Sequence, residues 1–116
     1  MNYLSQQLQI VIKVVLAVVL GSIVGLEREY SRKEAGLRTY SLVCLGSTLF
    51  TMIGFFLAER FNGSSIINID PTRVIQAVAV GIGFIGGGLI IYREFHVEGL
   101  TTAAGLWVVS AIGVAV

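Results

Sequence analysis

Four long apolar segments fill most of the chain, and they constrain its fold more than any other feature. They cover residues 8–26, 39–58, 74–92 and 100–116. Lys13 is the one charged residue within them. A helix that crosses the hydrocarbon of a bilayer needs about 20 apolar residues, with a range of about 17 to 25. The sequence therefore predicts an all-α membrane protein, a bundle of four transmembrane helices in a single domain over residues 1–116.

The composition supports the same conclusion. Hydrophobic residues make up 55% of the chain and charged residues 13%, whereas a soluble domain carries about 25% charged residues. A soluble globule of 116 residues has too little interior to bury this much apolar surface. We therefore expect the lipid bilayer to surround the helices. The net charge of +1 argues against a nucleic-acid partner, which needs a concentrated basic surface.

The polar segments predict how the chain is oriented. The lead MNYLSQQLQ has no basic side chain, so we interpret the first apolar segment as a retained helix and not as a signal peptide. Loops 27–38 and 93–99 together carry five Lys or Arg residues, against three on the other side when Lys13 is included. Because basic residues are enriched in cytoplasmic loops, these two loops are predicted to be cytoplasmic and the N-terminus outside. The ammonium of Lys13 is expected to extend to the interface; a functional intramembrane lysine is the alternative.

The stretch GIGFIGGGLI, residues 81–90, satisfies the pattern G-x-G-x-x-G of dinucleotide-binding turns. Such a turn needs a strand before it and a crossover helix after it, inside a parallel sheet. Too few residues separate Gly88 from Arg93 for that helix, and no further strand pattern follows. The context therefore contradicts a nucleotide site.

Packing between membrane helices explains the glycines better, because small residues let helix backbones approach closely in lipid. Ala79, Gly83 and Gly87 are spaced four apart, and so they lie on one helix face. We expect a bundle packed through Gly and Ala stripes. The predicted packing residues are Gly21, Gly25, Ala79, Gly81, Gly83, Gly86, Gly87 and Gly88. The same missing side chains could also line a narrow pathway or allow local unwinding.

Five sequence blocks carry a family resemblance. They are GLERE at 25–29, AGLRT at 35–39, DPTR at 70–73, GIGFIGGGLI at 81–90 and GLTTAAGLW at 99–107. In content, order and spacing the chain resembles the MgtC/SapB family of bacterial inner-membrane proteins over nearly its whole length. The resemblance implies a multi-pass inner-membrane protein linked to magnesium homeostasis and virulence. Family members usually have a fifth span and many add a C-terminal soluble domain, which we do not expect within this chain.

The resemblance also implies a mode of action. It indicates a non-enzymatic modulator that contacts itself as a homo-oligomer or contacts a membrane partner such as the F-type ATP synthase. A second hypothesis is an oligomeric ion transporter or channel, with the glycine-rich third helix near the pathway. We expect no enzymatic activity, because the sequence has no nucleophile–base–acid arrangement and no Walker motif.

No cofactor is expected, and a role for Mg²⁺ stays open. Mg²⁺ prefers an octahedron of oxygen ligands and retains several waters. Glu27, Glu29 and Asp70 are too few, and predicted to lie too far apart, for one site built from protein alone.

Polar side chains at the helix ends are the candidate functional residues. They are Glu27, Arg28, Glu29, Arg38, Thr39, Asp70, Arg73, Thr101 and Thr102. Two interpretations of the group near loop 27–38 are open. In one, the arginines anchor in lipid headgroups and Glu27 pairs with Arg38; in the other, the group binds a cation or a polar group of a partner. Asp70 is expected to cap the third helix, with Arg73 as its i+3 ion-pair partner; the alternative is a cation or proton site at Asp70. Tyr40 is expected at the membrane interface.

Overall fold

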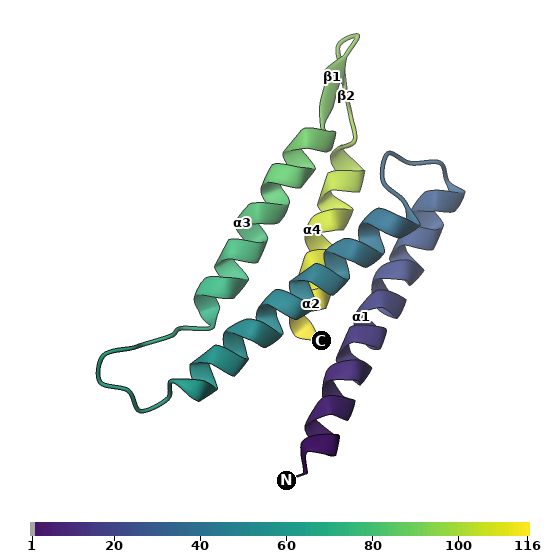
Figure 1. Cartoon of the computed structure of the whole chain (residues 1–116). Coiled ribbons are helices and arrows are strands. Elements are labelled where there is room, and N and C mark those ends of the chain that lie inside the picture. The colour runs from purple at the N-terminus through teal and green to yellow at the C-terminus, as the bar shows by residue number, and fades with distance from the viewer. Residues whose placement is uncertain (1) are drawn as a thin grey trace.

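Four helices and one short hairpin make up the protein, seen here in a computed structural model that describes residues 2–116. The helices are α1 (Tyr3–Tyr30), α2 (Leu37–Arg60), α3 (Thr72–Leu89) and α4 (Leu100–Ala115). Strands β1 (Ile91–Arg93) and β2 (His96–Glu98) pair antiparallel and join α3 to α4 (Figure 1). The all-α membrane bundle predicted from the sequence is confirmed. Arg93 is one of the five basic residues counted for loops 27–38 and 93–99, and its side chain is not among those that the structure describes.

The helix bounds differ from the predicted ones at the polar ends. Helices α1 and α2 continue past their apolar segments, because backbone hydrogen bonding does not stop where the hydrophobic residues do. The predicted third helix, 74–92, was wrong at its C-terminal end. The backbone of Ile90 is extended, and Ile91 pairs with Glu98 across the hairpin. Gly99 has φ +83°, in the left-handed region that favours glycine, and so it turns the chain into α4.

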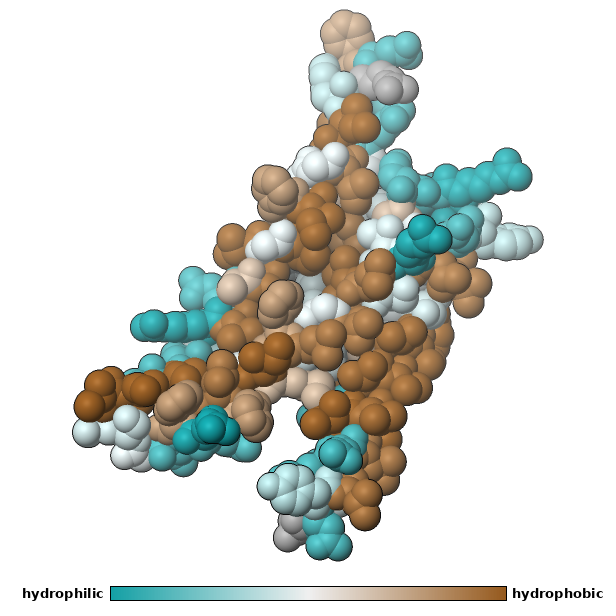
Figure 2. All heavy atoms as spheres, viewed as in Figure 1, coloured by the Kyte–Doolittle hydropathy of each residue, from teal (hydrophilic) through white to brown (hydrophobic). Residues whose placement is uncertain are grey.

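Within residues 2–116, α1, α2 and α3 are each long and apolar enough to cross a membrane. Helix α4 is apolar but has 16 residues, about 24 Å of rise against a hydrocarbon thickness of about 30 Å. Figure 2 shows hydrophobic side chains over the middle of the helices and hydrophilic ones gathered near their ends. This distribution is typical of a protein that spans a bilayer.

The core lies where α1 and α4 meet α2. Its buried residues include Ala17, Tyr40, Cys44, Leu106 and Val109. Helix α4 also packs on α3, whereas α3 makes few contacts with α2. The Cα atoms extend 57 × 31 × 14 Å, so the bundle is flat. Because packed helix axes lie about 8–10 Å apart, its thinnest dimension holds no more than two helices.

Close approach of α1 to α2 depends on two glycines. A Cβ on Gly21 would lie 2.7 Å from Cβ of Cys44 and 2.8 Å from the carbonyl oxygen of Tyr40. A Cβ on Gly25 would lie 2.8 Å from Cα of Leu37. These distances are shorter than a carbon contact of about 3.5–4.0 Å, so no larger residue fits without moving the helices apart.

Candidate functional site

A network of polar side chains links α1, α2, α4 and the loop between α1 and α2. We call it the polar network; it consists of Arg28, Glu34, Tyr40 and Thr102. Nη2 of Arg28 donates to Oγ1 of Thr102 at 3.3 Å, and this hydroxyl donates to Oε2 of Glu34 at 2.7 Å. The phenol of Tyr40 donates to the carbonyl oxygen of Thr102 at 2.9 Å. Thr102 therefore connects a cation and a carboxylate that are contributed by separate segments.

Three of the four residues of this network are largely buried. Thr102 is 1% exposed and Tyr40 is fully buried. The side chain of Arg28 is 15% exposed and lies 3.5 Å from the carboxylate of Glu27. Its Nε is buried and has no hydrogen-bond partner within residues 2–116. A buried guanidinium that is only partly satisfied is costly, so the bonds that it does make resist rearrangement.

The carboxylate of Glu34 is stabilised in its charged form. The hydrogen bond from Thr102 contributes most to lowering the pKa of Glu34, and the nearby charges of Lys33 and Arg28 lower this pKa further. Glu34 itself is exposed to solvent, so its carboxylate is accessible to protons from the medium.

The remaining residues near this end of the bundle have separate contacts. Glu27 pairs with Arg28 and accepts from the hydroxyl of Ser31 at 3.0 Å, so the ion pair with Arg38 considered from the sequence is not formed. Oε2 of Glu29 accepts from the backbone N–H of Leu37 at 2.8 Å, at the start of α2. Arg38 and Thr101 are exposed, and Thr39 is half-buried.

Asp70 and Arg73 lie at the opposite end, beside the loop between α2 and α3 (Figure 1). Oδ1 of Asp70 accepts from the backbone N–H of Thr72 at 3.0 Å and from its hydroxyl at 2.7 Å. These two bonds lower the pKa of the Asp70 carboxyl, with the hydroxyl contributing most. Within residues 2–116, no carboxylate lies within 4.0 Å of Arg73. The predicted i+3 ion pair is therefore not formed.

The glycines predicted to pack helices fall into two groups. Gly21 and Gly25 face α2, and a Cβ on Gly86 would lie 3.4 Å from Cβ of Ala103 in α4. The positions of the second group are not packed against another element: apart from the chain neighbours and the backbone of α3 itself, an added Cβ would have no atom of residues 2–116 within 4 Å. They are Gly81, Gly83, Gly87 and Gly88. Ala79 is also exposed.

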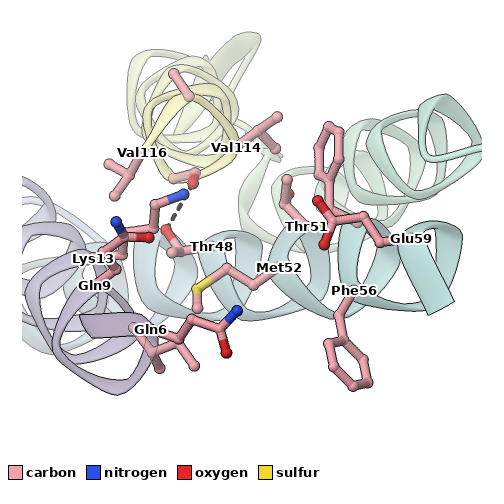
Figure 3. A pocket seen from close by; sticks show the side chains of 14 residues that line it. Gln6, Gln9, Lys13, Thr48, Thr51, Met52, Phe56, Glu59, Val114 and Val116 are labelled. Carbon is pink, nitrogen blue, oxygen red and sulfur yellow. Dashed lines mark hydrogen bonds between the residues drawn. The ribbon is translucent and has the colours of Figure 1, made fainter. Parts of the chain in front are cut away.

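A cavity with both polar and apolar lining residues lies between α1 and α2, next to the C-terminal end of α4. It has a volume of about 590 Å³. Figure 3 shows the side chain of Lys13 crossing it toward Thr48, with Gln6 and Gln9 beside it and Glu59 on α2. The hydroxyl of Thr48 donates its hydrogen to the carbonyl oxygen of Gly113 at 2.7 Å. Lys13 thus extends into this cavity.

No cluster of three His, Cys, Asp or Glu side chains within the described residues is arranged to hold a metal ion. The polar network offers one carboxylate, that of Glu34, beside the cationic Arg28. This donor set is a poor fit for Mg²⁺, because it supplies one carboxylate and its guanidinium repels a divalent cation.

Glu34 and Tyr40 were missed by sequence reasoning. Tyr40 was expected at the membrane interface; its ring is buried inside the bundle, and its hydroxyl lies against Gly105. The sequence did carry a signal. Tyr40, Cys44, Ser47 and Thr51 recur with helical spacing and are all buried, which marks the face of α2 that packs on the bundle.

Comparison with known proteins finds a matching family model and relatives from bacteria. The model of the MgtC family matches residues 14–116. The putative magnesium transporter YhiD of Escherichia coli (strain K12) is 37% identical over 93% of this chain and 50% of the relative. Protein SrpB of Synechococcus elongatus is 39% identical over 87% of this chain and 59% of the relative.

Protein MgtC of Brucella abortus (strain 2308) is 41% identical over 84% of this chain and 38% of the relative. The chain thus spans about half the length of the curated relatives it matches. No solved structure gives a significant match.

Proposed function

The chain belongs to the MgtC family, and on this premise we propose that it is a non-enzymatic modulator that acts in magnesium homeostasis from the bacterial inner membrane. It acts through contacts between its own helices and those of a second copy or of another membrane protein. The name of the relative in Escherichia coli, a putative magnesium transporter, supports the link to magnesium. Following the family resemblance, we extend the proposal to virulence and to the F-type ATP synthase as a partner.

One face of α3 carries the proposal. We call it the outer face; it consists of Gln76, Gly83 and Gly87. At 3.6 residues per turn these positions fall within about 40° of one another. All three residues are exposed, and outside α3 no atom of residues 2–116 lies within 4 Å of a Cβ added at either glycine. Membrane helices associate through such small-residue surfaces and through amides that bond across the interface.

The polar network supports the proposal in a second way. It ties the N-terminal turn of α4 to α1 and to the loop before α2 through Thr102. Helix α3 packs on α4. A fixed α4 therefore holds the outer face of α3 in one orientation. A preorganised surface loses less conformational entropy when its partner binds.

Gly83→Leu tests the proposal, with Gly81→Leu as its matched control. Both positions have open space beside them, so both variants are expected to fold. The two residues lie about 200° apart around α3, so only Gly83→Leu blocks the outer face. We expect Gly83→Leu to reduce the mass of complexes extracted from native membranes, and Gly81→Leu to leave this mass unchanged. Equal masses for wild type and Gly83→Leu would contradict the proposal.

Transport of a cation by an oligomer is a second candidate function, which the ionisable side chains of Lys13 and Glu59 in the cavity lining favour. The bundle is 14 Å thin, so a pathway through it would need several copies. The ammonium of Lys13 opposes entry of a divalent cation into the cavity, which weighs against this candidate. Uptake of Mg²⁺ by reconstituted vesicles that Asp70→Ala abolishes would favour transport. Vesicles that stay tight to Mg²⁺ would favour the modulator.

A further inference from the structure

An apolar groove runs between α2 and α3 and is independent of the polar network and of the outer face. Its volume is about 740 Å³. Leu42 and Phe50 of α2 line it on one side, and Val78 and Ile85 of α3 on the other. Helices α2 and α3 touch near the loop that joins them, where Val74 lies against Gly54, and they make few other contacts. The groove is therefore a slot between two splayed helices, within the hydrophobic surface of Figure 2.

A cation that forms no ion pair within 4.0 Å among residues 2–116 lies at one end of this groove, although the Asp70 carboxylate is near enough to sense its charge. Arg73, in the first turn of α3, contributes to the lining and is exposed. No carboxylate of the described residues lies within 4.0 Å of it, since the oxygen of Asp70 that faces α3 is bonded to Thr72. A guanidinium at this position calls for an anionic group with oxygen acceptors, for which phosphate is well suited.

The length of the groove matches one leaflet of a bilayer. From Arg73 to Ile85, α3 rises about 18 Å, and half of the hydrocarbon thickness is about 15 Å. Gly46 and Gly81 lie within the groove and have open space at their Cβ positions. An extended hydrocarbon chain could therefore run along both helix backbones while its polar end reaches Arg73.

Charge decides between a phospholipid and a helix as the occupant. An apolar transmembrane helix would cover the groove but would bring no anion to Arg73, whereas a phospholipid supplies both an acyl chain and a phosphate.

We propose that this groove binds one phospholipid, with an acyl chain over Gly46 and Gly81 and the headgroup phosphate at Arg73. The ligand belongs to the leaflet that borders the loop between α2 and α3. Binding fills the slot that α2 and α3 leave open and stabilises their relative position.

Native mass spectrometry of the full chain in mild detergent, titrated with phosphatidylglycerol, tests the proposal. We expect wild type to retain one lipid per chain. Arg73→Gln should weaken binding about tenfold through loss of the charge-assisted bonds, whereas Arg60→Gln at the same membrane boundary should stay within about twofold of wild type. Gly81→Leu should also weaken binding about tenfold by filling the slot, whereas Gly83→Leu should bind as wild type does.

Two results would overturn the proposal. One is equal lipid affinity in Arg73→Gln and Arg60→Gln. The other is a smaller oligomer in Gly81→Leu with unchanged lipid retention, which would assign the groove to a second copy. Arg73→Gln changes an exposed side chain that makes no ion pair within residues 2–116, so it keeps the test decisive even if Gly81→Leu fails to fold. The result for Gly83→Leu on assembly is a separate measurement, so this proposal and the proposed function can fail independently.

Discussion

The hydroxyl of Thr102 donates to the carboxylate of Glu34 at 2.7 Å, across 68 positions of the sequence. The same oxygen accepts from Arg28. One buried threonine thus joins the start of α4 to two segments at the other end of the chain. This relationship gives the first prediction.

Thr102→Val should lower the free energy of unfolding by about 1–3 kcal/mol, because it leaves Nη2 of the mostly buried Arg28 without its acceptor. Titration with a denaturing detergent in mixed micelles measures this energy. Thr101→Val, at an exposed neighbour, should change it by no more than about 0.5 kcal/mol. Equal effects of the two substitutions would mean that the polar network does not stabilise the bundle.

The pH dependence of stability should reveal Glu34. The pKa of its carboxyl is lowered below the ordinary value of 4.5 in the folded chain. Its contribution to stability is therefore fully present above about pH 4.5, and it is lost as the pH falls through the lower folded pKa. Unfolding measured from pH 7 down to pH 3 should show this loss in wild type and a shallower decline in Glu34→Gln. Parallel curves would contradict the assigned hydrogen bond.

Two glycine-to-alanine substitutions should change the free energy of unfolding in opposite directions. Gly21→Ala should destabilise the bundle by about 1–3 kcal/mol, because its methyl group meets Cys44 and the backbone of α2. Gly81→Ala has open space and should stabilise α3 by about 0.5–1 kcal/mol through backbone entropy. Thermal unfolding in detergent separates the two, and a stabilising Gly21→Ala would show that α1 and α2 are not tightly packed.

Orientation in the membrane can be read with single cysteines. Cys44 is buried and should not react with a membrane-impermeant maleimide in the folded protein. We predict that Ser65→Cys, in the loop between α2 and α3, is labelled in intact cells. Ser31→Cys, in the loop between α1 and α2, should be labelled only after the membrane is permeabilised. The reverse pattern would place the N-terminus in the cytoplasm.

Much of the fold follows from local sequence, and most of the site does not. Apolar length alone predicts the helices, and the four-residue spacing of Gly21 and Gly25 indicates the face of α1 that meets α2. The end of α3 was mispredicted because Ile90, Ile91 and Tyr92 continue its apolar run, although the hairpin after them takes these residues out of the helix.

The polar network was harder to predict because its bonds join segments far apart in the chain. Glu34 looks like one more charge in a loop, and its role depends on Thr102 arriving from α4. Arg38 has the same local character as Arg28, yet it is exposed while Arg28 is mostly buried. Only the packing of three helices distinguishes them.

Photocrosslinking in native membranes tests the central claim most directly. A photoreactive residue at Gln76, on the outer face of α3, should form an adduct with a second copy or with another membrane protein. The same residue at Ile85, inside the groove, should form an adduct with lipid alone. The account predicts a protein adduct at position 76. If position 76 yields only lipid adducts under both low and high magnesium, the outer face binds no partner and the proposed function is contradicted.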